Sequence, residues 1–183
     1  MKPCEGPVVE SERLLLRRLE PSDATRVREL ANHPRIASVT TNIPHPYPEG
    51  LAEGWIATHG ALWAAGKAVH FGIRRRRDGL LVGVIGLEGM DGIRGTLGYW
   101  LGVDYWSRGY ATESCRALVE WAGRETDLKE LQALHMLRNP ASGRVLQKSG
   151  FHLVGEKVAE LGGRAERVAE YRRGLDDCRP GGA

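Results

Sequence analysis

The feature that most constrains the fold is a change of hydrophobic period near Gly109. Upstream of it, three runs rich in apolar residues are separated by short glycine-containing turns: 68–74, 80–90 and 96–103. Runs and turns of these lengths predict an antiparallel meander of three strands. Downstream, apolar residues recur at helical intervals: Ala111, Cys115, Leu118, Val119 and Ala122. The chain therefore has to pass from a strand into a helix close to Gly109.

The segment before the meander predicts one strand and two helices. Residues 13–20 predict a strand, and the helix-start residues at 21–23 lead into a helix over 23–32. Three prolines within 43–48 exclude regular structure there. A second helix is predicted over 50–66, where three large residues form a rough apolar stripe: Leu51, Trp55 and Leu62.

The segment after the first long helix predicts a strand, a helix and two more strands. Residues 130–137 form the strand, and Asn139-Pro140 begins the helix as an N-cap followed by a proline. That helix is predicted to end near Gly150, because the residue that ends a helix in a left-handed backbone conformation is usually glycine. The last strands are predicted at 151–158 and 166–174.

Together these elements predict an α/β (α+β) fold. Its central sheet is mixed, with an N-terminal antiparallel meander, a β-α-β crossover and helices on both faces. The 183 residues are long enough for a real core, so we expect one domain over 1–183. Residues 1–10 and 175–183 are expected to be flexible tails.

Composition argues against several classes of protein. No run approaches the ~18 apolar residues of a membrane span, and the charged N-terminus lacks a signal-peptide core, which predicts a cytoplasmic protein with no membrane partner. The cysteines are too few and too widely spaced for a disulfide framework or a metal cluster: Cys4, Cys115 and Cys178. A net charge of +3 does not demand a nucleic-acid partner, and the arginines at 74–77 suit a solvated hairpin better than phosphate contacts.

The bend between the meander and the long helix is YWSRGYATES, residues 105–114. The first N–H groups of a helix lack intrahelical partners and attract anions, and small residues let a ligand approach the backbone. Arg108 adds a positive charge beside Gly109. Taken alone, the bend is equally compatible with a strand–helix turn that uses glycine for steric reasons.

With a second motif, NPASGRVLQKSGF at 139–151, the bend resembles the GNAT superfamily of acyl-CoA-dependent N-acetyltransferases, most closely its RimJ/RimL-type branch. The resemblance extends from SERLLLRRLEPSD at 11–23 through the final strands. It implies acetyl-CoA as cosubstrate, no metal, and a pyrophosphate site made by Arg108, Gly109, Tyr110, Ala111 and Thr112. The superfamily's glutamine or arginine three residues before the glycine is Trp106 here, a departure common in this branch.

The resemblance also assigns the strand GYWLGV, residues 98–103, to the pantetheine arm of the cofactor. A β-bulge is expected to splay this strand from the next one, and Leu101 and Val103 are expected to present main-chain groups to the cofactor. Asn139 resembles a family asparagine that contacts the cofactor, although an N-cap before a proline needs no ligand.

The implied chemistry is direct attack of a neutral amine on the thioester, with a backbone N–H stabilising the oxyanion. Ser142 matches a serine of this branch that could donate a hydrogen bond to the departing thiolate, since the tyrosine that many relatives use is replaced by Gln147. Glu88 is the first candidate for the general base, because it ends the middle strand of the meander near the expected acyl group. An exposed structural carboxylate is the alternative for Glu88. His70 and His135 are weaker candidates.

The acceptor is expected to be a primary amine, either of a protein N-terminus or of a small molecule. An α-amine, with a pKa of ~7.7–8.0, costs about 3.5 kcal/mol less to deprotonate than a lysine with a pKa of ~10.4. A site without a clear strong base therefore favours a protein N-terminus, as in the ribosomal-protein type. The alternatives are a small amine (a polyamine, an antibiotic or an amino-acid derivative) and a non-catalytic acyl-CoA-binding module. The acceptor side of the site is expected to be lined by residues 43–48 and by the helix over 50–66. A homodimer, which is common among relatives, is left open.

Overall fold

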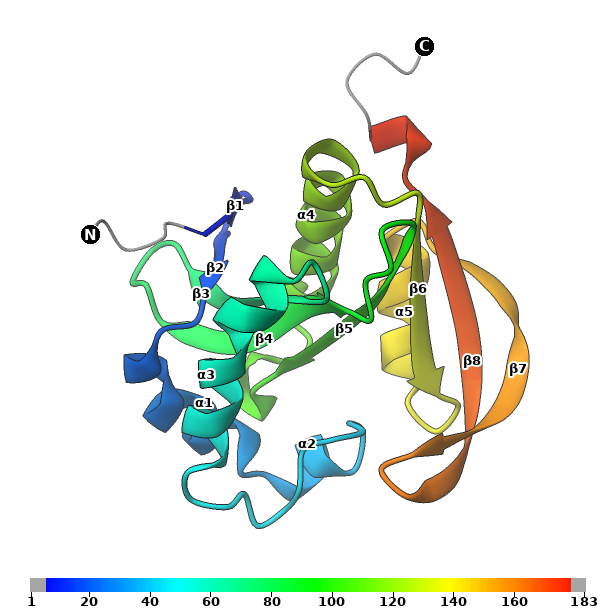
Figure 1. Ribbon diagram of the computed structural model, residues 1–183. Helices are drawn as coiled ribbons and strands as arrows, with labels where there is room; N and C mark the ends of the chain where they lie inside the picture. Colours follow the sequence, from blue (N-terminus) through cyan, green and yellow to red (C-terminus); the bar gives the residue numbers. More distant parts are fainter. Residues whose placement is uncertain (1–5, 179–183) are drawn as a thin grey trace.

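A single eight-stranded mixed sheet organises the computed structural model, which describes residues 6–178 (Figure 1). Its strand order is β1-β2-β3-β4-β5-β6-β8-β7, and the only parallel neighbours in this order are β5 and β6. The strands are β1 (Val8–Glu10), β2 (Leu14–Arg18), β3 (Val69–Arg75), β4 (Leu81–Glu88), β5 (Arg94–Leu101), β6 (Glu130–Met136), β7 (His152–Leu161) and β8 (Arg164–Gly174). The predicted mixed sheet with an antiparallel meander is confirmed.

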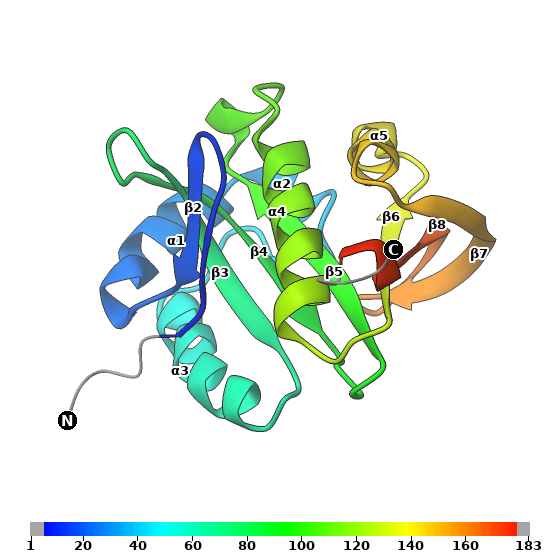
Figure 2. The ribbon, with the colours of Figure 1, turned by 90° about the horizontal axis from the view of Figure 1, so that it is seen from above.

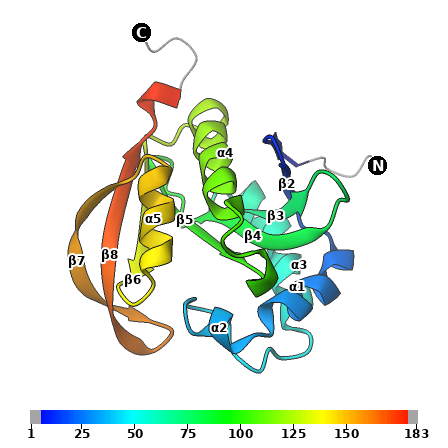
Figure 3. The ribbon, with the colours of Figure 1, turned by 180° about the vertical axis from the view of Figure 1, so that it is seen from behind.

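Helices cover both faces of this sheet, as predicted. α1 and α3 lie on one face and α4 on the other (Figure 2), and α5 packs beside α4 (Figure 3). The larger apolar core lies under α4 and includes the fully buried Phe71 and Leu118, whereas a smaller core lies under α1 and α3. The helices are α1 (Ala24–Ala31), α2 (Pro34–Ala37), α3 (Leu51–Ala64), α4 (Tyr110–Glu125) and α5 (Pro140–Lys148). Among the described helices, none is long and apolar enough to cross a membrane.

The two parallel strands β5 and β6 separate partway along their length. They pair over three positions, which end with Thr96 opposite Gln132, and then diverge (Figure 1). The ladder between β4 and β5 is continuous, from Glu88 opposite Thr96 to Gly83 opposite Leu101. The expected splay is therefore present, but the predicted bulge does not occur in this ladder. One edge of β5 faces an opening instead of a neighbouring strand.

Parts of both predicted tails are structured. Val8–Glu10 pair with β2, and Val9 is buried while its two neighbours are exposed. At the other end, Leu175 is fully buried and Asp176–Cys178 form a 3-10 turn. Such short segments carry too few residues for a periodic signal. The remaining tail residues, 1–5 and 179–183, lie outside the described residues.

The apolar stripe predicted for α3 is wrong. The buried residues of this helix are Ala52, Ile56 and His59, whereas Leu51 is exposed and Trp55 is half-buried. Leu51 and Trp55 line a cavity, and Trp55 also packs against the smaller core under α1 and α3.

The four arginines at 74–77 all contact protein groups. Arg74 is buried and forms an ion pair with Asp23, with Nη2 and Oδ1 2.5 Å apart. The others bond to nearby groups of the hairpin and of the β1–β2 turn: Arg75 and Arg77 to Asp78, and Arg76 to the Ser11 carbonyl. Each of the four arginines therefore has a protein partner in or near the hairpin.

Candidate active site

A cavity of about 1090 Å³ lies where β5 and β6 separate. It is lined from both faces of the sheet, by α1–α3 and the loop between α2 and α3 on one side and by α4 and α5 on the other. Most of the predicted site residues line it: Glu88, Leu101, Gly109, Tyr110, Ala111, Thr112, Asn139 and Ser142, together with His70 and His135. Within residues 6–178, no group of three or more His, Cys, Asp or Glu side chains is placed to hold a metal ion.

The bend at Gly109 forms one end of this cavity. Gly109 is the N-cap of α4 and has a φ of 80°, in the left-handed region that glycine adopts without strain. The first helical hydrogen bond runs from the Glu113 N–H to the Gly109 carbonyl at 3.0 Å. The N–H groups of Tyr110, Ala111 and Thr112 therefore precede the helical ladder, and their residues line the cavity. These groups can hold an anion.

A cluster centred on Glu113 ties this bend to the β1–β2 turn. Its carboxylate accepts hydrogen bonds of 2.7 Å from Ser11 Oγ and from the main-chain N–H and Nε of Arg13. Arg13 Nη1 in turn donates to the Arg108 carbonyl at 3.1 Å, and its guanidinium lies over the Tyr110 ring. Burial raises the pKa of Glu113, but these hydrogen bonds outweigh burial, so the net pKa is lowered.

Replacing Glu113 by alanine is expected to lower the free energy of unfolding by about 2 kcal/mol, because hydrogen bonds to a charged group are lost. Since the pKa of Glu113 is lower in the folded protein, its contribution is present above the unfolded-state pKa and is lost as the pH falls through the folded-state value. Urea unfolding at neutral and acidic pH measures both effects. The matched control is Glu120→Ala on the same helix, whose ion pair with Arg124 is exposed. An equal loss in both variants would contradict the prediction.

Two predicted cofactor residues lie outside the cavity lining. Arg108 is exposed, and its Nε donates to the Asp104 carbonyl at 3.0 Å. Val103 was expected in the strand, but β5 ends at Leu101 and Val103 begins a 3-10 turn. The indole N–H of Trp106 donates to the Leu101 carbonyl at 2.8 Å. Trp106, which replaces the superfamily's polar residue, thus holds the bend against the end of β5.

The free edge of β5 presents main-chain groups to the cavity. The N–H of Gly102 donates to the Val82 carbonyl, whereas the Leu101 carbonyl points away from β4, toward Trp106. Because main-chain direction alternates along a strand, Tyr99 also directs its N–H and C=O groups toward the opening. The Leu97 N–H faces Gln132, the last β6 residue paired with β5, so only the Leu97 C=O faces the opening. The sequence predicted Leu101 for this role and missed the other two.

A hydrogen bond of 3.1 Å joins the Tyr99 hydroxyl, as donor, to Ser142 Oγ across the opening. Burial raises the pKa of Tyr99, so its phenol stays protonated. In the sequence, Gln147 of α5 stands where many relatives have a tyrosine. In the structure, the tyrosine hydroxyl comes instead from Tyr99 of β5. Strand alternation was the available signal, because Tyr99 lies on the same face as the buried Leu97 and Leu101.

The Asn139 side chain makes no N-cap hydrogen bond to α5, contrary to that alternative. Its carbonyl accepts the Ser142 N–H at 3.1 Å, and the residue lines the cavity. His135 contacts the Met136 carbonyl through Nδ1 at 2.9 Å, and its ring packs where a side chain at Gly143 would lie. Asn139 therefore remains a candidate for cofactor contact, and His135 has a packing role.

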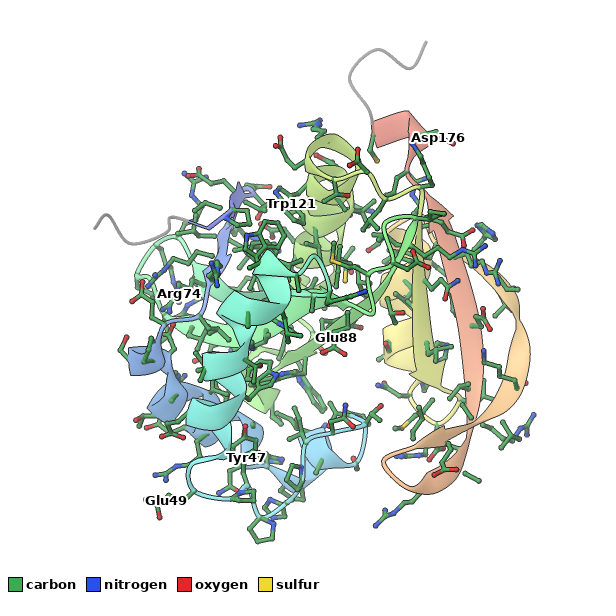
Figure 4. All side chains as sticks on the ribbon, viewed as in Figure 1. Tyr47, Glu49, Arg74, Glu88, Trp121 and Asp176 are labelled. Atoms are coloured by element: carbon green, nitrogen blue, oxygen red, sulfur yellow. The ribbon has the colours of Figure 1, made fainter. Side chains whose placement is uncertain are left out.

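Glu88 and His70, predicted as separate candidates, form a pair on the α3 side of the sheet. Glu88, labelled in Figure 4, has its Oε1 3.0 Å from His70 Nε2, and this hydrogen bond lowers the pKa of Glu88. The His70 ring stacks on the buried His59 ring, with centroids 4.3 Å apart, and Trp55 meets both rings edge-on. Burial, the neighbouring His70 and Arg18 lower the pKa of His59 to about 4. The cluster therefore contains one ionised carboxylate, that of Glu88, which is hydrogen-bonded to the imidazole of His70.

Comparison with known proteins assigns this arrangement to a family. The model of the acetyltransferase (GNAT) domain matches residues 13–152. The uncharacterized N-acetyltransferase YoaA of Bacillus subtilis is 26% identical over 151 residues, which cover 81% of this chain and 85% of YoaA. The putative ribosomal N-acetyltransferase YdaF of the same organism is 27% identical over 150 residues, covering 77% and 79%.

A solved structure of RimL, a ribosomal L7/L12 alpha-N-protein acetyltransferase in complex with coenzyme A, has the same fold. It aligns with a TM-score of 0.83 and 21% identity over 91% of this chain and 97% of RimL. The matched family model spans β2 to α5, including the bend at Gly109 and the separating strands. The chain belongs to the GNAT family of N-acetyltransferases, in its RimJ/RimL-type branch.

Proposed function

We propose that this protein transfers the acetyl group of acetyl-CoA to a primary amine in the cavity between β5 and β6. The observation that carries the proposal is that the free edge of β5, the start of α4 and the Tyr99–Ser142 pair all line one cavity. Coenzyme A is bound in the structure of the similar protein RimL, which supports a coenzyme A ester as the donor.

The residues at the bend fit a pyrophosphate group. The first N–H groups of α4 precede the helical ladder, and the positive end of the helix dipole adds to their attraction for anions. Gly109 has no side chain, whereas a Cβ at this position would come within 3.2 Å of Arg13 Nη2. The N–H and C=O groups of Tyr99 and the C=O of Leu97 would pair with the pantetheine arm. Acetyl-CoA supplies the acetyl thioester.

Residues of β5 and α5 would then act on the developing charges. A main-chain N–H at the free edge of β5 stabilises negative charge on the acyl oxygen. Ser142 donates a hydrogen bond to the leaving sulfur, and its own oxygen accepts from Tyr99. The phenol therefore orients the serine hydroxyl, and its hydrogen bond makes the Ser142 O–H a stronger donor to the departing thiolate.

Glu88 accepts the proton of the attacking amine, directly or through one water, and His70 orients it. Because the hydrogen bond from His70 lowers the pKa of Glu88, this carboxylate is a weak base. A weak base suits an amine whose own pKa is low, so a protein N-terminal α-amine is favoured over a lysine side chain. The names of RimL and YdaF support the ribosomal-protein type of acceptor.

Thiol release from acetyl-CoA in the presence of N-terminal peptides and small amines tests the proposal. Wild-type protein is expected to turn over at least one amine, and Ser142→Ala is expected to lower kcat by about 100-fold with the acetyl-CoA KM retained. Tyr99→Phe is expected to lower kcat by less, because the serine remains. Gln147→Ala, an exposed change on the same helix, is the control. Acetyl-CoA binding without thiol release for any amine would instead indicate a non-catalytic binding module.

A further inference from the structure

We infer that the acceptor is a primary amine on an apolar, uncharged body, and that its ammonium group is bound by Glu88 at the end of a chamber whose floor is formed by Gly86 and Gly98. The inference rests on the proposed acetyl transfer and adds the chemical class of the acceptor. It concerns the half of the cavity on the α1–α3 side of the sheet.

Two glycines leave the floor of this chamber without side chains. Gly86 of β4 lies opposite Gly98 of β5, and His70 of β3 lies opposite Gly86, so the three residues form one row on the same face. A Cβ added at Gly98 would meet nothing within 4 Å, whereas one at Gly86 would come within 2.4 Å of the Val69 carbonyl oxygen, so the open space lies over Gly98. Glycine in the middle of a strand is destabilising and often marks a place where a ligand approaches closely. Both glycines line the cavity.

The walls of the chamber are apolar and largely aromatic. They come from the sheet, α2, α3 and the proline-containing loop before α3, whose Tyr47 is labelled in Figure 4: Ile36, Tyr47, Leu51, Trp55, Val84 and Trp100. The exposed Leu51 and the half-buried Trp55 both line this chamber. Such walls favour the carbon skeleton of an apolar amine.

The charges around the chamber select for a cation. Among the described residues that line the cavity, Glu88 is the only carboxylate. The only lysine or arginine side chains among these lining residues are Arg144 and Lys148 of α5. That helix lies on the other side of β5, where its Ser142 bonds to Tyr99. The imidazole of His70 holds Glu88 in place, and the stacked His59 ring fixes His70. An ammonium group is attracted to this carboxylate and to the Trp55 ring. An acceptor with a carboxylate beside its amine would be repelled by Glu88.

Three acceptors that differ in one group test the substrate class: phenylalaninamide, phenylalanine methyl ester and phenylalanine. With acetyl-CoA as donor, thiol release is expected for the first two, with kcat/KM at least about 100-fold higher than for phenylalanine. Equal turnover of phenylalanine, or turnover of spermidine or N-terminal peptides without that of the two uncharged-body amines, would overturn the inference and leave acetyl transfer standing. No thiol release with any amine would overturn acetyl transfer itself.

Graded substitutions at Gly98 test the chamber. Gly98→Ala and Gly98→Leu place side chains in open space, so each step is expected to raise KM for phenylalaninamide, by about 30-fold or more for leucine, while acetyl-CoA affinity stays within about threefold. The cofactor-facing groups are retained because they belong to Leu97 and Tyr99. Gly174→Leu, at the end of β8 and also in open space, is the matched control. Unchanged KM, or equal loss of acetyl-CoA binding, in a folded Gly98→Ala protein would contradict the assignment.

Glu88→Gln keeps the shape of the side chain and removes its charge. It is expected to raise KM for phenylalaninamide by at least about 30-fold, to lower kcat as well because Glu88 is the proposed proton acceptor, and to leave acetyl-CoA binding unchanged. A fall in kcat alone, with KM retained, would assign Glu88 to proton transfer and not to binding of the ammonium group.

Discussion

Replacing Gly109 by aspartate is expected to weaken acetyl-CoA binding by at least about 100-fold, equivalent to about 2.8 kcal/mol. The new carboxylate would lie at the positive end of α4, where the helical N–H groups would otherwise meet the pyrophosphate, and it would repel that group. The left-handed φ of 80° and the contact of a Cβ with Arg13 at 3.2 Å add strain. Isothermal titration calorimetry measures the affinity directly.

Two further variants separate charge from strain at this bend. Gly109→Ala carries the same backbone strain without a charge, so it is expected to lose much less affinity than the aspartate variant. Gly92→Asp places the same substitution at a φ of 88° in the exposed β4–β5 turn, in open space, and should bind acetyl-CoA as the wild type does. Wild-type affinity of a folded Gly109→Asp protein would show that the pyrophosphate binds elsewhere.

Replacing Asp23 by alanine is expected to lower the free energy of unfolding by about 3–5 kcal/mol, because it leaves the buried Arg74 guanidinium without its counter-charge. Asp23 and Arg74 side chains are only 11% and 10% exposed. The second Asp23 oxygen accepts the Glu20 N–H at 2.9 Å, so the change also removes a contact at the start of α1. Urea denaturation monitored by circular dichroism gives the free energy.

The double variant Asp23→Ala/Arg74→Met tests the cause of this loss. Removing both charges is expected to recover most of the lost stability, since no unpaired buried charge remains. Glu49→Ala removes an almost fully exposed carboxylate that lies 3.9 Å from Arg28, and it should change stability by less than about 0.5 kcal/mol. A loss below about 1 kcal/mol for Asp23→Ala would mean that Arg74 finds water or another partner.

Sequence patterns predicted the elements whose signals are local. The Asp78-Gly79 turn, the switch of period at Gly109 and the Asn139-Pro140 helix start each depend on a few adjacent residues, and the structure contains all three. Short or environment-dependent features were missed. β1 has only three residues, and Val103 leaves the strand because Gly102 ends the β4–β5 ladder and the chain turns into the bend.

The sequence by itself thus determined the mixed sheet, its helices, the glycine at the bend and the family to which the chain belongs, because turn chemistry, capping and hydrophobic period act between near neighbours. Only the tertiary structure joined Tyr99 to Ser142, Glu88 to His70 and Ser11 to Glu113, pairs that are 43, 18 and 102 residues apart. These contacts depend on how strands and helices pack to bury apolar surface. The place where β5 leaves β6 decides which side chains meet there, and no local pattern encodes that separation.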